Sequence, residues 1–135
     1  MGYRSDVGIV VWAEEPDVID ELLAVYAMMP SVQKHGGADA LGWERFETKI
    51  GEGLRCYFED VKWYQGYDDV QATEDMFGLV TAFYEERGVV IGARFIRVGE
   101  DANDIVECDY GDPDIYLGDF MVTHTTINFY NFKIS

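Results

Sequence analysis

Basic residues are scarce in this chain, and one long stretch has none. Ten Lys and Arg stand against 26 Asp and Glu, so the formal net charge is −16. No Lys or Arg occurs from residue 98 to residue 132. Because binding to nucleic acid depends on a basic patch that neutralises phosphates, this scarcity argues against a protein that binds DNA or RNA directly.

Cysteine and histidine are also sparse. The two cysteines, Cys56 and Cys108, are far apart and belong to no CxxC pair. We expect two reduced, partly buried thiols, with a disulfide between them as the alternative. The two histidines, His35 and His124, are isolated, whereas a zinc site recruits three or four ligands at regular spacing. The sequence therefore predicts no metal site of this kind.

Long apolar runs are missing from the beginning of the chain. The early run at residues 7–12 is short and is soon followed by Glu14 and Glu15. A membrane-spanning helix needs about 20 apolar residues, and a signal peptide has a longer apolar core than this. We therefore expect a cytoplasmic protein.

Familiar catalytic and cofactor motifs are absent as well. Neither G-x-S-x-G nor the phosphate-binding loop occurs, and Gly51-Glu-Gly53 fails the dinucleotide pattern because Cys56 holds the last glycine position. A calcium loop starting at Asp101 fails because Val106 stands where the bend requires glycine. The sequence indicates no cofactor and no metal, and an enzyme is not favoured.

Aromatic and aliphatic residues are plentiful. Hydrophobic residues make up 48% of the chain, which includes nine Tyr, eight Phe and three Trp. Disordered acidic proteins lack such buriable surface, so we expect one folded domain over residues 1–135 with its charge on the outside.

The excess charge should make stability depend on salt. Repulsion among the acids opposes compaction, and salt screens it over about 8–10 Å at physiological ionic strength. We expect the melting temperature to rise from low salt to about 0.5 M sodium chloride in a thermal unfolding series. A melting temperature that fell steadily over that range would contradict this prediction.

The residue pattern predicts strands and helices in alternation. Pro16 and the acids around it mark a helix start, Pro30 its end, and Gly88 suits the left-handed cap of a second helix. The expected elements, in chain order, are a central strand at 7–12, a helix at 16–29, a strand at 43–50 whose pattern also fits a helix, a strand at 54–64, a helix opening at Asp68 or Asp69 and ending at Arg87, a strand at 89–98, a turn at 99–104, a strand at 105–110, and one or two strands within 115–134.

This order indicates an α+β fold. Strand, helix, two strands, helix and strand correspond to an antiparallel sheet with two helices on one face, in the ferredoxin-like β-α-β-β-α-β arrangement with extra C-terminal strands. The opposite face of the sheet needs a cover, which we expect to be the C-terminal segment or another subunit.

Three short segments carry a resemblance to a known group of proteins. They are residues 1–7 (MGYRSDV), residues 62–70 with their Trp-Tyr and Tyr-Asp-Asp-Val, and residues 95–101 (FIRVGED). In these segments the chain resembles small acidic proteins of tailed bacteriophages, a group largely of unknown function. Residues 31–53 show no such match. The resemblance implies a phage origin and supplies no catalytic residues.

The acids of the C-terminal third form the candidate site. We expect them to make one electronegative surface that binds a basic, nucleic-acid-binding host protein, with carboxylates standing in for phosphates. The residues are Asp101, Asp104, Glu107, Asp109, Asp112, Asp114 and Asp119. A merely solubilising acidic face, an enzyme with paired carboxylates, and a homo-oligomer joined through the C-terminal strands are the alternatives.

Overall fold

The central strand is built from the β-branched run near the start of the chain. The computed structural model describes residues 4–34, 42–48, 51–64, 67–101, 104–114, 122–123 and 127–128. Strand β1 (Ser5–Ala13) lies between β3 (Gly51–Val61) and β4 (Ile91–Gly99), antiparallel to both. Its residues are almost all buried, as the near-continuous apolar run predicts. The expected central position is confirmed.

Helix α1 (Pro16–Ala27) begins as the sequence predicts. Glu15 is its N-cap and Pro16 its first residue, where a proline costs no hydrogen bond. Its end differs from expectation, because the helix stops at Ala27 and Pro30 begins a short helix, α2 (Pro30–Lys34). Proline lacks the amide proton that an interior turn needs but suits a first turn, so Pro30 both follows one helix and opens another.

Helix α3 (Asp68–Arg87) is the longest element. The expectation that Asp68 or Asp69 caps it is wrong, because the backbone is extended only up to Tyr67, which takes the N-cap position without a side-chain hydrogen bond. The C-terminal cap is as expected. Gly88 has a φ of 66°, in the left-handed region that glycine enters without a steric penalty.

The five long strands form one antiparallel sheet in the order β2-β3-β1-β4-β5. Its outer strands are β2 (Glu44–Thr48) and β5 (Ile105–Gly111), and the chain is α+β with three helices among the described residues. A ferredoxin-like fold has a four-stranded sheet and two helices. The observed strand order differs from it by the additional edge strand β5, and the number of helices differs by the additional short helix α2.

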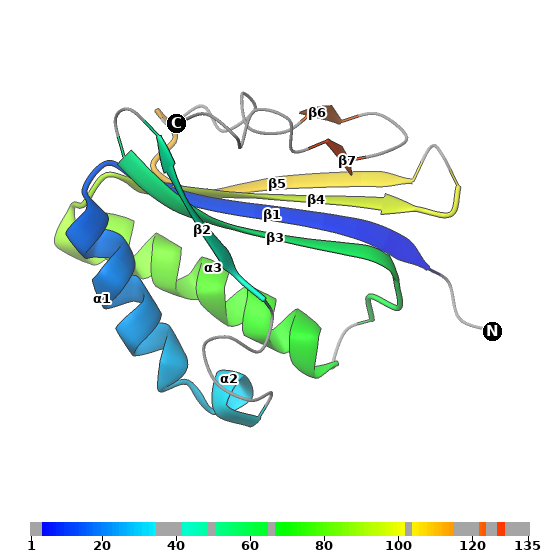
Figure 1. The fold of residues 1–135 in the computed structure, drawn as a ribbon, viewed down its shortest axis with the longest axis horizontal. Coiled ribbons are helices and arrows are strands. Elements are labelled where there is room, and N and C mark those ends of the chain that lie inside the picture. Colours follow the sequence, from blue (N-terminus) through cyan, green and yellow to red (C-terminus); the bar gives the residue numbers. More distant parts are fainter. Residues whose placement is uncertain are drawn as a thin grey trace.

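The two faces of the sheet are covered differently (Figure 1). The helices lie on one face, where α1 and α3 pack on β1, β3 and β4. On the other face lies the small hairpin of β6 (Val122–Thr123) and β7 (Ile127–Asn128), and β7 contacts β1. The expected cover by the C-terminal segment is thus seen in those described residues.

The charged side chains that the structure describes lie outside the core, as the sequence predicts. Among the described residues the buried polar side chains are Ser5 and Thr73, and no Asp, Glu, Lys or Arg is buried. Neither cysteine forms a disulfide, and Cys56 is buried whereas Cys108 is partly exposed. In the described part of the chain, no helix has the length and apolar character needed to cross a membrane.

Candidate functional site

The acids named from the sequence lie along one hairpin, formed by β4 and β5. Asp101 is in the connecting turn, Glu107 and Asp109 are in β5, and the turn after β5 holds further acids. In chain order the described members are Asp101, Asp104, Glu107, Asp109, Asp112 and Asp114. Asp119 lies outside the described residues.

Arginines of β4 pair with three of these acids. Arg94 donates from one guanidinium nitrogen to both carboxylate oxygens of Asp109, at 2.9 and 3.0 Å, and lies 3.5 Å from Glu107. Arg97 binds both oxygens of Asp104, at 3.0 and 3.2 Å. Charge-assisted, two-oxygen contacts of this kind are the stronger class of side-chain hydrogen bond. Three of the six described acids are therefore paired with arginines of the same hairpin, and the single electronegative surface stays a prediction.

The paired acids also divide between the two faces of the sheet. Side chains alternate along a strand, so Glu107 and Asp109 share one face with Arg94. Phe95 packs on Phe77 of α3 and so marks the helix-covered face. Arg97 is two residues beyond Phe95 on the same strand, so Arg97 and its contact with Asp104 lie on the helix-covered face.

The remaining acids shape the two ends of the hairpin. At one end Asp112 accepts a hydrogen bond from the backbone N–H of Asp114 at 2.9 Å. At the other end Glu100 accepts one from the N–H of Arg4 at 2.7 Å, beside the turn that contains Asp101. The seven residues of β5 separate the ends by roughly 24 Å, more than twice the Debye length of about 8–10 Å. The two ends are therefore separate acidic patches in physiological salt.

A row of paired charges crosses the whole sheet. Val10 on β1 has Arg55 on one side and Arg94 on the other. Arg55 faces Glu44 at one edge of the sheet, and Arg94 faces Asp109 at the other edge. Arg55 and Arg94 are only 18% and 17% exposed, whereas Glu44 and Asp109 are 63% and 67% exposed. The row thus presents its carboxylates outward and keeps its guanidinium groups over the sheet.

An aromatic cleft lies beside the acids, and the sequence reading did not identify it. Its volume is about 190 Å³, between α3 and the edge of the sheet. Helix α3 provides Thr73, Glu74 and Phe77, and β5 provides Cys108 and Tyr110. The rings of Phe77 and Tyr110 are stacked, with centroids 4.3 Å apart. Burial raises the pKa of Tyr110, and neighbouring Cys108 adds to this effect. In the sequence, Cys108 and Tyr110 alternate with Glu107 and Asp109, and this pattern could have indicated that the two less polar side chains share one side of the strand.

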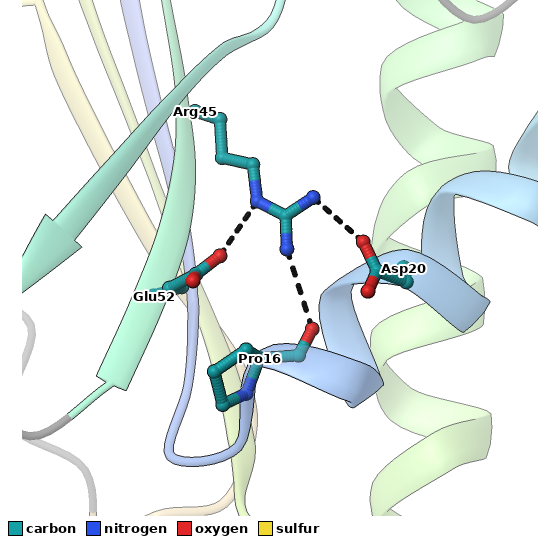
Figure 2. A network of polar contacts seen from close by, with 4 residues as sticks. All are labelled: Pro16, Asp20, Arg45 and Glu52. Atoms are coloured by element: carbon teal, nitrogen blue, oxygen red, sulfur yellow. Dashed lines mark hydrogen bonds and ion pairs between the residues drawn. The ribbon is translucent and has the colours of Figure 1, made fainter.

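Arg45 forms the other well-connected polar cluster (Figure 2). It donates to Asp20 at 2.7 Å, to Glu52 at 2.6 Å and to the carbonyl oxygen of Pro16 at 3.4 Å. The hydrogen bond to Asp20 is the main reason that the pKa of Arg45 is raised. These contacts connect β2 and β3 to α1. The cluster therefore has a structural role in joining the sheet to the helix.

A second hollow, of about 210 Å³, lies where α1 begins and α3 ends. Glu14, Glu15 and Val18 line it from one side and residues 88–90 from the other. In the described ranges, no group of three or more His, Cys, Asp or Glu side chains is arranged to hold a metal ion. Of the sites described, the β4–β5 hairpin with its adjoining cleft combines charge, exposure and an apolar hollow.

Comparison with known proteins adds no assignment. No protein-family model, no curated protein and no solved structure matches the chain.

Proposed function

We propose that this is a phage-encoded binding protein that occupies a basic surface of a host nucleic-acid-handling or defence protein. The observation that carries the proposal is the charge left on the β4–β5 hairpin after its internal pairing. Residues 94–114 hold seven acids and two arginines, so five negative charges remain. Complementary charge of this size accelerates association and favours basic partners. The proposed location is the host cytoplasm.

The exposed strand acids support a role as a nucleic-acid mimic. Glu107 and Asp109 are 42% and 67% exposed although both contact Arg94. They lie two residues apart on one face of a strand, about 7 Å along its axis. Rigid carboxylates at this spacing can occupy positions that phosphates take in a basic groove. No chemical step is required of them, and we propose no catalytic activity.

The homo-oligomeric accessory protein is the weaker proposal. It needs the C-terminal strands to pair across subunits, but β7 contacts β1 of the same chain. Light scattering separates the two proposals, because a stable dimer that is lost on deletion of residues 127–135 would favour the oligomer.

A finer proposal concerns the topology. We infer a ferredoxin-like fold extended by β5. Its support is that β3 lies between β1 and β2, as a split β-α-β unit requires, and that α1 and α3 pack on the same face.

Reversing two hairpin acids should slow capture of the partner. The variant Asp101→Lys/Asp114→Lys changes two exposed carboxylates at the ends of the hairpin and moves the net charge from −16 to −12. A basic partner is first captured from bacterial lysate at low salt and then purified. We expect its association rate, measured by surface plasmon resonance, to fall about tenfold and to depend less on salt.

The matched control is Glu47→Lys/Glu59→Lys, which reverses two exposed acids of β2 and β3 and has the same net charge. It should change the association rate by less than about twofold. Equal slowing in both variants would show that net charge alone acts and would remove the hairpin as the binding site.

A further inference from the structure

Strand β5 lies at the edge of the described sheet, and its side chains form two chemically different sides. In the described sheet order β5 is the last strand and pairs only with β4. An edge strand carries backbone N–H and C=O groups that point away from its neighbour and can pair with another chain. Along β5, exposed and half-buried residues alternate from Ile105 to Tyr110. Each side of the strand therefore has its own chemistry.

On the helix-covered side, Cys108 and Tyr110 border the aromatic cleft. Ligand pockets for small molecules measure roughly 300–1,000 Å³, and this cleft of about 190 Å³ is smaller. It has room for one large apolar side chain, which would lie against Phe77 and Phe95. Glu74, also lining the cleft, is exposed and adds a negative charge there.

On the opposite side, Glu107 and Asp109 present exposed carboxylates. The arginine that contacts both of them, Arg94, comes from β4 and therefore approaches from the interior of the sheet. A second cation can approach the same carboxylates from the outer edge of β5. A strand laid beside β5 would place every second side chain on this side. Charge complementarity then calls for Lys or Arg at those positions.

We infer that β5 binds an extended segment of the partner as an additional strand, in which basic residues alternate with apolar ones. The basic residues face Glu107 and Asp109, and one apolar side chain enters the cleft beside Cys108. Main-chain hydrogen bonds provide affinity and the alternating side chains provide specificity, as in other cases of strand addition. This inference rests on the proposed function, because it specifies how the acidic hairpin engages a basic partner.

Cys108 provides the readout. The probe is a seven-residue peptide, matched to the length of β5, in which lysines alternate with valines around a central phenylalanine. We expect it to slow maleimide labelling of Cys108 about tenfold and to protect the backbone amides of β5 from hydrogen exchange. Cys56 is buried and should stay unlabelled. The variant Cys108→Ala identifies any labelling that comes from elsewhere.

Three control peptides separate strand addition from simple charge attraction. One has the same composition with its lysines grouped, one has N-methyl groups on its backbone amides, and one is all lysine. Strand addition predicts labelling rates within about twofold of the peptide-free rate for all three. If the all-lysine peptide protects as well as the alternating one, or if the alternating peptide gives no protection, the inference is overturned.

Failure of the proposed function gives a different result. In that case Asp101→Lys/Asp114→Lys would bind the purified partner as fast as the unmodified protein, whatever the peptides do. Slowed association of that variant but not of Glu47→Lys/Glu59→Lys, together with no peptide protection, would overturn strand addition alone and leave the acidic hairpin as the binding surface.

Discussion

Raising the pH from about 8 to about 12 should lower the free energy of unfolding by several kcal/mol. Burial raises the pKa of Cys56 from its ordinary value of 9.0 to about 12. Burial also raises the pKa of Tyr26 from 10.0 to about 12, although its hydrogen bond with Trp43 acts in the opposite direction. Both groups therefore stay neutral in the folded chain at pH values where they ionise in the unfolded chain.

The sign follows from proton binding. Above about pH 9 the unfolded chain loses the Cys56 proton that the folded chain keeps, so unfolding becomes easier as the pH rises. The stabilising contribution is complete below about pH 9 and is lost as the pH approaches the folded pKa. One pKa unit corresponds to about 1.4 kcal/mol, so Cys56 contributes roughly 3–4 kcal/mol and Tyr26 roughly 2–3 kcal/mol. Small domains have only about 5–15 kcal/mol in total.

Urea denaturation at a series of pH values, with a reducing agent present, measures this loss. Two variants separate the groups. Cys56→Ala should lack the part of the decline that begins near pH 9, and Tyr26→Phe the part that begins near pH 10. Other groups that titrate in alkali add the same slope to all three proteins, so only the differences count. A profile of Cys56→Ala that runs parallel to the original between about pH 9 and pH 10 would contradict the assignment.

The same glycine-to-alanine change should have opposite effects at two positions. Gly53 on β3 faces Phe46 on β2, and a Cβ there would lie 2.5 Å from the Phe46 ring and 2.5 Å from the carbonyl oxygen of Val11. Ring or backbone must move to accept it, and overpacking of this kind costs roughly 1–3 kcal/mol. We expect Gly53→Ala to lower the free energy of unfolding by that amount.

Gly78 is the matched control, at an exposed position of α3 where an added Cβ meets nothing within 4 Å. Alanine is the better helix former by about 0.5–1 kcal/mol, so Gly78→Ala should stabilise the protein. Urea denaturation of both variants gives the two signs. In Gly53→Ala, the further change Phe46→Leu should recover part of the loss if the ring contact is responsible. Unchanged stability of Gly53→Ala would show that the close packing over β3 is not tight.

Features that depend on short sequence spans could be predicted. The β-branched run placed β1 in the middle of the sheet, Pro16 marked the start of α1, and Gly88 marked the end of α3. The N-cap of α3 at Tyr67 was not predicted because its side chain makes no capping hydrogen bond, so no capping residue type marks the position in the sequence. The short helix α2 was missed because Pro30 is equally suited to follow a helix and to begin one.

The composition by itself determined that the chain has enough aromatic and aliphatic surface to fold and carries sixteen excess negative charges, and none of the charged side chains that the structure describes is buried. Only the tertiary structure decided which of those charges are paired. Arg94 lies opposite Asp109 because β4 and β5 pair in one register, and a slip of one residue would turn every side chain of β5 to the other face. The register of β4 with β5 and the packing of α3 against β5, which forms the cleft, both depend on contacts between separate segments of the chain. Neither can be predicted from the local spacing of residues.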